Sequence, residues 1–268
     1  MSKHPLSIRL FFLVNKKINT FPKMVKAFVK GCLLGILSRE TLQSIDKAYY
    51  DLESETYLSE AHNRGGMLPW EMRSIMRFFQ GCQTILVAAA GGGREVLALH
   101  NMGFDVDGFE CHPELFAYAE ELLRKENFRG TLQLVRRDEC SEGERVYDGA
   151  IIGWGAYMLI QGRELRISFL RRMRARMREG APLLLSFFAR SSDDVYFKVI
   201  ATTGNIIRAI LFKERVELGD ALGAEYLHFF TEGEIASELK EAGFLLQYYS
   251  TEEYGHAVGT SIKSASEE

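Results

Sequence analysis

The sequence predicts an α/β protein in which parallel strands alternate with helices on both faces of one doubly wound sheet. The first observation is a set of short apolar runs between residues 84 and 189, most of them separated by stretches with helical spacing. Alternation of this kind is typical of a parallel sheet that is covered on both faces. The second observation lies near the C-terminus, where two strand-like runs are joined by a short turn. This pair predicts a terminal antiparallel hairpin.

The region before the first strand, from Pro5 to about Gln80, has apolar residues at three- and four-residue spacings and is predicted to be helical. Pro22 breaks this pattern once, and the stretch HNRGGMLPWE (62–71) breaks it again. Pro69 suits the first turn of a helix. We therefore expect an N-terminal helical arm over residues 1–80, followed by a body over residues 81–268.

The body is predicted to begin with the strand TILVAAA and to end with a helix that has its own capping signals. Thr231 and Glu234 fit a capping box, and Gly243 fits the left-handed position after a helix. The expected strands are 84–90, 104–110, 131–135, 147–153, 181–189, 245–250 and 254–262, and the expected helices are 93–102, 113–126, 163–179 and 231–244. Residues 190–230 form an insertion.

Charge is distributed unevenly along the chain, whose formal net charge is −3. Eight Lys or Arg residues and no acid precede Glu40, which leaves 25 bases and 36 acids in the remainder. A basic arm therefore precedes an acidic body. Because the body is acidic, and because the arginines of 163–178 suit the wet face of an amphipathic helix, a nucleic-acid partner is disfavoured.

The cysteines and apolar runs indicate a cytoplasmic protein without a metal site. The four cysteines form no C-x-x-C pair, so neither a disulfide scaffold nor a zinc site is expected. The runs RLFFLV (9–14) and AFVKGCLLGIL (27–37) are shorter than the about 20 residues of a spanning helix. We also expect no signal peptide, since no small-residue cleavage site follows them.

The stretch AAAGGG (88–93) lies directly after the first predicted strand, at the point where doubly wound folds bind ligands. Small residues let another group approach the backbone closely. The pattern here is A-x-G-x-G from Ala89 to Gly93, and Arg94 occupies the place of the third glycine in a dinucleotide-binding turn. The loop predicts a cofactor site, with close helix–strand packing as the alternative.

Two acids follow the next strands at positions that suit a nucleoside. Glu110 ends the second strand and is placed to accept hydrogen bonds from ribose hydroxyls. Asp138, in LVRRDE, is placed to accept one from an adenine amine, with Glu139 as the competing candidate. The alternative interpretations are a solvated acid at a strand end and a turn residue.

Together these motifs resemble the class I S-adenosylmethionine-dependent methyltransferases, over roughly Thr84 to Ile262. The resemblance includes the glycine loop, DVDGFECHPELFAYAEE (105–121), LVRRDE, YDGAIIGWGA (147–156) and the terminal helix with its hairpin. It implies a Rossmann-like, seven-stranded sheet in which only the last strand is antiparallel, and S-adenosylmethionine as cofactor. The implied cofactor-binding residues are Ala89, Gly91, Gly92, Gly93, Glu110, Cys111, Asp138 and Trp154.

Two positions depart from the resembled family. Val87 stands where members usually have an acid inside the first strand, and Ala89 stands where they have glycine. The loss of the acid weakens the expected anchoring of the methionine amino group. Ala89 is costly only if its backbone adopts a positive φ.

The acceptor is expected to lie against parts of the chain outside the family motifs. Tyr57, Asn63 and Trp70 from the arm and His228 from the insertion are the candidate pocket residues. These regions are rich in aromatic and aliphatic residues, which favours a small, partly apolar acceptor. His228 is a candidate general base, but a lone histidine also suits a structural role. Methyl transfer mainly requires alignment and exclusion of water, so no further catalytic residue is assigned.

Two rival functions remain: a nicotinamide-dependent oxidoreductase, which the A-x-G-x-G spacing and the hairpin disfavour, and a non-catalytic cofactor-binding or membrane-surface module. The basic arm has two interpretations as well. It is expected to form a lid over the pocket, since helical covers are common in the resembled family. The alternative is peripheral contact with an anionic membrane. The oligomeric state, the acceptor and the methylated atom are left open.

Overall fold

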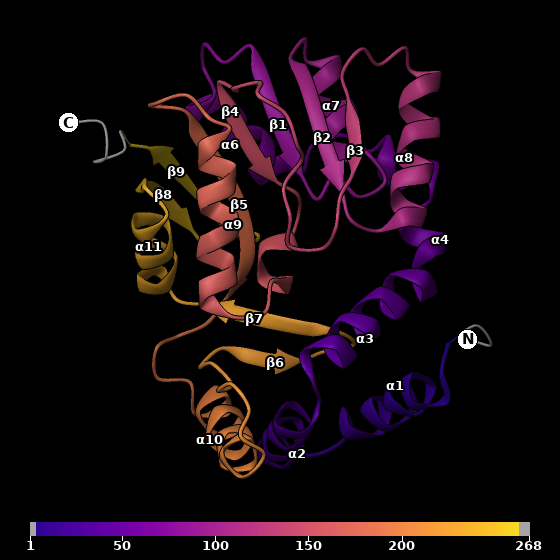
Figure 1. The fold of residues 1–268 in the computed structure, drawn as a ribbon, viewed down its shortest axis with the longest axis vertical. Coiled ribbons are helices and arrows are strands. Elements are labelled where there is room, and N and C mark those ends of the chain that lie inside the picture. The colour runs from indigo at the N-terminus through magenta and orange to yellow at the C-terminus, as the bar shows by residue number, and fades with distance from the viewer. Residues whose placement is uncertain (1–3, 263–268) are drawn as a thin grey trace. The chain divides into compact units, whose positions relative to one another are not determined.

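The computed structural model describes residues 4–262, which fall into two compact units. The smaller unit contains residues 4–53 and 189–231, and the larger unit contains residues 54–188 and 232–262 (Figure 1). The expected division into 1–80 and 81–268 extends beyond the described residues and stays a prediction. In the structure, residues 54–80 belong to the larger unit.

The larger unit is built on one sheet of seven strands in the order β3-β2-β1-β4-β5-β9-β8. Neighbouring strands are parallel except β9, which runs antiparallel to both β5 and β8. This confirms the predicted sheet and its terminal hairpin. The strands are β1 (Thr84–Ala88), β2 (Asp105–Glu110), β3 (Leu132–Leu134), β4 (Gly149–Ile152), β5 (Pro182–Ala189), β8 (Phe244–Ser250) and β9 (Gly255–Ser261).

The strand order creates a switch point between β1 and β4. From β1 the chain proceeds to β2 and β3 on one side, and it later returns to β4 and β5 on the other side. Both neighbours are parallel to β1 and in register with it, with Ile85 opposite Val106 and Gly149. The carboxyl ends of β1, β2 and β4 therefore lie at one edge, where open α/β sheets bind ligands.

Helices cover the sheet because their apolar faces pack onto it. Val87 of β1 belongs to the same core cluster as Ile75 and Val96 from two of these helices. The helices are α4 (Ser54–Tyr57), α5 (Glu60–Asn63), α6 (Pro69–Phe78), α7 (Arg94–Asn101), α8 (Pro113–Lys125), α9 (Arg163–Ala175) and α11 (Glu232–Glu241), with a 3-10 turn at Ala156–Leu159.

Helix α9 ends earlier than the predicted residue 179. Its last helical residue is Ala175, because the next residues pair with the chain just before β4. The Tyr147 N–H donates to the Arg176 carbonyl, and the Arg178 N–H donates to the Tyr147 carbonyl. Since these backbone groups are used in a parallel bridge, they are not available for another helical turn.

The smaller unit combines the first three helices with the insertion. Its elements are α1 (Leu6–Ile18), α2 (Lys23–Ile36), α3 (Arg39–Leu52), α10 (Val195–Ile210), β6 (Asp220–Leu222) and β7 (Tyr226–Phe230), and β6 pairs antiparallel with β7. The insertion, for which no element was predicted, thus contains a helix and two strands. No helix within residues 4–262 has both the length and the apolar character needed to cross a membrane.

Helices α2 and α10 pack side by side through glycines. A Cβ added at Gly31 would lie 2.7 Å from the Ile200 carbonyl oxygen, and one at Gly35 would lie 3.0 Å from the Gly204 carbonyl oxygen. These distances are too short for a side chain, so the two backbones approach each other directly. Because Gly31 meets Ile200 and Gly35 meets Gly204, the two helices run in the same direction.

A buried ion pair joins α9 to α11 in the larger unit. Arg166 and Glu238 are each 1% exposed, and Arg166 Nη2 donates to Glu238 Oε1 at 2.7 Å. Arg166 Nε also bonds this carboxylate, and the Tyr157 hydroxyl donates to it at 2.5 Å. The same two helices carry a second, exposed pair between Arg163 and Glu241.

The Glu238→Gln substitution should destabilise the larger unit by about 3–5 kcal/mol, because it leaves the Arg166 guanidinium buried without a counter-charge. Urea unfolding followed by circular dichroism measures the effect. Glu241→Gln is the matched control and should leave the midpoint nearly unchanged, since its pair is in water. Equal shifts of the urea midpoint in the two variants would show that burial of the Arg166–Glu238 pair does not contribute to stability.

Candidate functional site

Glu110, the last residue of β2, joins the glycine loop to the start of α8. Its Oε2 accepts a hydrogen bond from the Gly91 N–H at 2.8 Å. Its Oε1 accepts from the N–H groups of Cys111 at 2.8 Å and His112 at 2.7 Å. The residue is only 4% exposed, so the alternative interpretation of Glu110 as a solvated strand-end acid is wrong. Oε2 accepts a single bond and retains a lone pair for a ligand hydroxyl.

The loop after β1 adopts left-handed backbone conformations at three positions. Ala89 has φ 51°, Gly91 has φ 56° and Gly93 has φ 97°. The backbone strain expected for a positive φ at Ala89 is therefore present. A left-handed conformation costs a residue with a Cβ about 1–2 kcal/mol. A Cβ added at Gly91 would meet no atom of the described chain within 4 Å. The space over Gly91 is open beside the Glu110 carboxylate.

Two of the candidate pocket residues, Tyr57 and Asn63, lie against Gly92. A Cβ added at Gly92 would be 2.5 Å from Asn63 Oδ1 and 2.7 Å from the Tyr57 carbonyl oxygen. Asn63 is 1% exposed, and its Nδ2 donates to the carbonyls of Tyr57 at 2.7 Å and Ser59 at 3.0 Å. Asn63 Oδ1 has no hydrogen-bond partner among the described residues. A buried, unpaired acceptor therefore faces the glycine loop.

Arg94, the first residue of α7, is buried between two carboxylates. Its Nη1 and Nη2 each donate to one oxygen of Glu71 at 2.7 Å, and Nη2 also donates to Glu95 Oε1 at 2.7 Å. All three residues are at most 5% exposed. Burial raises the pKa of Glu71 even though Arg94 bonds it. With both acids ionised, the cluster carries one net negative charge next to the glycine loop.

Glu95 extends across the switch point. Its Oε1 accepts a hydrogen bond from the Trp154 N–H at 3.1 Å, in the loop that follows β4. Since α7 begins directly after the β1 loop, this bond connects the two sides of the crevice between β1 and β4. Glu71 and Glu95 are not among the site residues predicted from the sequence. The only signal was their residue type, because the contacts join distant parts of the chain.

Aromatic side chains gather near the same loop. The rings of Trp154 and Tyr254 meet edge-on with centroids 5.6 Å apart, and Tyr254 stacks on Trp70 at 5.9 Å. Phe188 approaches Tyr254 at 5.4 Å. Trp154 is 42% exposed and Trp70 is buried in the core. Of these aromatic side chains, Trp154 is therefore the one that can contact a ligand, whereas Trp70 supports the others from the core. Tyr254 was not among the residues predicted from the sequence.

Asp138 lies beyond the end of β3, on the side of the sheet that Glu110 occupies. The Val135 N–H donates to the Glu110 carbonyl at 2.9 Å, so the chain leaving β3 passes next to the end of β2. Asp138 is half-buried and has φ 62°, and its carbonyl accepts a hydrogen bond from Arg172. Its role, like that of half-buried Cys111, stays a prediction.

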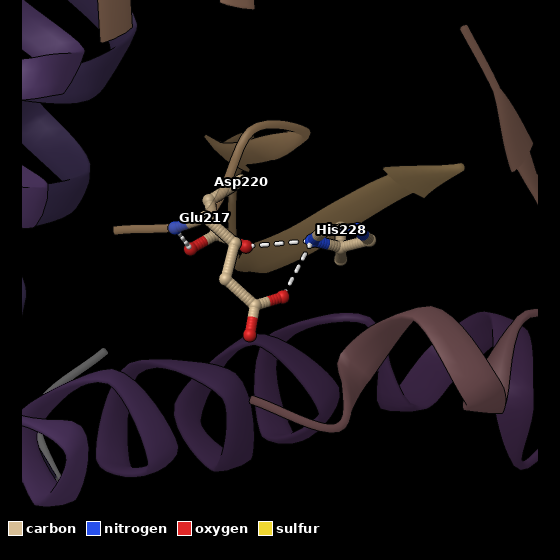
Figure 2. A group of neighbouring side chains, drawn as sticks. All are labelled: Glu217, Asp220 and His228. Carbon is tan, nitrogen blue, oxygen red and sulfur yellow. Dashed lines mark hydrogen bonds and ion pairs between the residues drawn. The ribbon is translucent and has the colours of Figure 1, made fainter. Parts of the chain in front are cut away.

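His228 lies in the smaller unit and is 1% exposed. Its Nδ1 is 2.7 Å from Asp220 Oδ1 and 3.7 Å from Glu217 Oε2, and Figure 2 shows that this edge of the ring faces both carboxylates. Glu217, Asp220 and His228 each offer one metal-ligand atom, and these three atoms lie within 4.8 Å of one another. Such a group of side chains can hold a cation or share a proton.

The Asp220 carboxylate is already used by hydrogen bonds within the smaller unit. Its Oδ1 accepts from the Tyr226 hydroxyl at 2.6 Å, and its Oδ2 accepts from the Glu217 N–H at 2.8 Å. Burial opposes ionisation of Asp220, but the hydrogen bond and charge of His228 keep the pKa of this carboxyl below its usual value. This network favours a histidine–carboxylate pair with a proton on His228 Nδ1, whereas Nε2 has no partner within residues 4–262.

The comparisons with known proteins identify the fold. No protein-family model matches the chain, and no curated protein matches it by sequence. Solved structures do match. A methyltransferase dependent on S-adenosylmethionine, from Methanosarcina mazei, is 19% identical with a TM-score of 0.59; the match covers 74% of this chain and all of the other.

Two further matches carry names that state an activity. A 1,6-didemethyltoxoflavin-N1-methyltransferase from Burkholderia thailandensis is 16% identical with a TM-score of 0.59, over 85% of this chain and 92% of the other. A sugar N-methyltransferase from Streptoalloteichus is 16% identical with a TM-score of 0.56, over 80% and 93%. This chain therefore has the fold of the class I S-adenosylmethionine-dependent methyltransferases.

The hydrogen bond that Asp220 accepts should select one tautomer of His228. In the neutral form of the His228 ring, long-range proton–nitrogen NMR should show the proton on Nδ1 and a bare Nε2. Asp220→Ala should shift the tautomer equilibrium because it removes the acceptor, whereas Tyr226→Phe, the control, retains that acceptor. A proton on Nε2 in the unmodified protein would contradict this assignment.

Proposed function

We propose that this protein transfers the methyl group of S-adenosylmethionine to a small, partly apolar acceptor. The observation that supports this most directly is the open space over Gly91 beside the buried Glu110 carboxylate. It lies at the edge of the sheet where ligands of doubly wound folds bind. Left-handed glycines and a carboxylate with a remaining lone pair suit a ribose that approaches the backbone closely.

We assign residues at neighbouring strand ends to the separate parts of this cofactor. In the proposal, Glu110 accepts hydrogen bonds from the ribose hydroxyls and Asp138 accepts one from the adenine amine. Because these two residues follow β2 and β3, the amino-acid end of the cofactor would extend in the opposite direction, towards β4. There the chain offers the Glu95 carboxylate and the loop at Trp154.

Glu95 compensates in this proposal for the acid that β1 lacks at Val87. The cluster of Glu71, Arg94 and Glu95 has two acids for one base and lies at the switch point. One net negative charge in a buried setting favours a cation nearby. The unpaired Asn63 Oδ1 adds a neutral acceptor at the glycine loop. Both features suit an ammonium group, which has hydrogen-bond donors and a positive charge.

The bound cofactor supplies a methyl group on a positively charged sulfur. The chain's own contribution is to orient the reactants and exclude water, which together account for much of the rate in such a displacement. The half-exposed Trp154 ring can attract a cation through its face. Tyr254 and Trp70 hold that ring in place.

A small acceptor is supported by the character of the site and by the solved neighbours. The aromatic group of Trp154, Tyr254 and Phe188 offers an apolar surface at the crevice. The neighbours include a methyltransferase for a toxoflavin precursor and one for a sugar nitrogen, both of which are small molecules by name. The identity of the methylated atom is not part of the proposal.

Isothermal titration should show micromolar binding of S-adenosylmethionine and S-adenosylhomocysteine, and none of NADH. Glu110→Gln should weaken this binding by roughly 1.5–3 kcal/mol, because it removes a charged acceptor from the ribose hydroxyls. The control is Glu139→Gln, which changes an exposed acid close to Asp138 and should bind normally. Binding of NADH alone would overturn the proposal in favour of an oxidoreductase.

Glu95→Gln tests the amino-acid end separately. It retains an oxygen for the Trp154 N–H but removes the charge, so affinity for S-adenosylhomocysteine should fall about tenfold. Affinity for 5′-methylthioadenosine, which lacks the ammonium group, should stay the same. If the variant weakens both ligands equally, Glu95 supports the loop and does not contact the amino-acid end.

A further inference from the structure

The smaller unit exposes an unusual share of large apolar side chains. Of the 22 large hydrophobic residues that are exposed among the described residues, 15 belong to this unit, which contains about a third of the chain. Single exposed hydrophobics are normal on protein surfaces, but concentrations of them mark interaction sites. The concentration of exposed apolar side chains on the smaller unit therefore indicates an interaction surface.

Helix α1 is apolar on two opposite faces. One face, which includes Ile8, Phe11 and Ile18, is buried within the smaller unit. The other face presents Leu6, Leu10, Leu13 and Val14, which are 40–77% exposed. Their spacing of three and four residues places them along one stripe of the helix. Because water is a poor solvent for this stripe, a contact with another apolar phase would stabilise it.

The ends of α2 and α10 form a second apolar projection. Lys213 Nζ donates to the Ile36 carbonyl at 2.7 Å, which holds the end of α2 beside the segment after α10. The last turns of α10 expose Ile206 and Ile210, and the segment after it exposes Leu211 and Phe212. Phe212 is 98% exposed and has φ 52°, a backbone conformation that is unfavourable for a phenylalanine. A strained backbone at a residue whose aromatic ring is fully exposed indicates a functional role for that ring.

Basic side chains accompany both apolar features. Arg9, Lys16 and Lys17 lie exposed on α1, and Lys213 and Arg215 are exposed next to Phe212. The smaller unit, counted as residues 1–53 and 189–231, has 14 bases and 10 acids; the rest of the chain has 19 bases and 26 acids. Exposed apolar stripes among basic residues are typical of helices that lie in the interface of an anionic bilayer.

Other occupants fit these features less well. A second copy of the chain would bring the same positive charge to the contact, which is repulsive. A nucleic acid would use the lysines but would leave the apolar stripes in water. A protein partner would have to cover three separate helices. Helices of 13 to 16 residues are also too short to span a bilayer, so only a surface location suits them.

We propose that the smaller unit docks on an anionic lipid surface through the exposed face of α1 and the projection around Phe212. In Figure 1, α1, α2 and α10 follow one another along the lower part of the drawing. Leu10 and Phe212 enter the interfacial layer, and Lys16, Lys17 and Lys213 contact lipid headgroups. Of the two interpretations of the basic arm, this proposal adopts the membrane surface. It does not depend on methyl transfer.

Co-sedimentation of the full-length protein with vesicles tests the proposal. The protein should bind vesicles containing about 30% phosphatidylserine, whose negative surface potential attracts basic segments. It should bind neutral phosphatidylcholine vesicles at least tenfold more weakly, and added salt should reduce binding. Affinity for the anionic vesicles should fall at least tenfold in each of two double variants, Leu10→Ser/Phe212→Ser and Lys16→Glu/Lys17→Glu.

The matched control is Met76→Ser, which removes an exposed hydrophobic residue (63% exposed) from the larger unit and should bind like the unmodified protein. Circular dichroism confirms that each variant is folded. Absence of binding to anionic vesicles at low salt would overturn the proposal. So would a dimer in light scattering that the Leu10→Ser/Phe212→Ser variant abolishes, because the apolar surface would then belong to self-association.

Discussion

The buried Arg94 guanidinium connects the parts that form the candidate site. It bonds Glu71 of α6, its neighbour Glu95 on α7 and the Gly66 carbonyl before α6. Through Glu95 the network continues to the Trp154 N–H after β4. The planar guanidinium makes four such hydrogen bonds with its five donors, one more than the three donors of a lysine allow. The position of the crevice walls therefore depends on this one side chain.

The fold followed from periodicity, because the larger unit repeats strand and helix in a regular order. The loop at 88–93 and Glu110 could be proposed as a candidate site because they lie at the ends of consecutive strands. The terminal hairpin was predictable for a similar reason, since only a short turn joins its two strands. Local signals were sufficient for these features.

The remaining features depend on contacts between distant residues. The pairing of Glu71 with Arg94 joins segments that have no common pattern. The end of α9 is set by Tyr147, which bonds the backbone beyond Ala175. In the insertion, α10 packs on α2 through glycines, a contact that no local signal of residues 190–230 reveals. Sequence reasoning found His228, but the carboxylates on its Nδ1 side became visible only in the structure.

The glycine contact between α2 and α10 has a consequence for synthesis of the chain. Residues 23–36 leave the ribosome long before residues 195–210, and the core of the smaller unit requires both. At about 5–20 residues per second, the first helices wait on the order of ten seconds for their partner. During this interval their buried stripes, as well as their exposed ones, are in contact with water. The smaller unit therefore completes its folding only after most of the larger unit has been made.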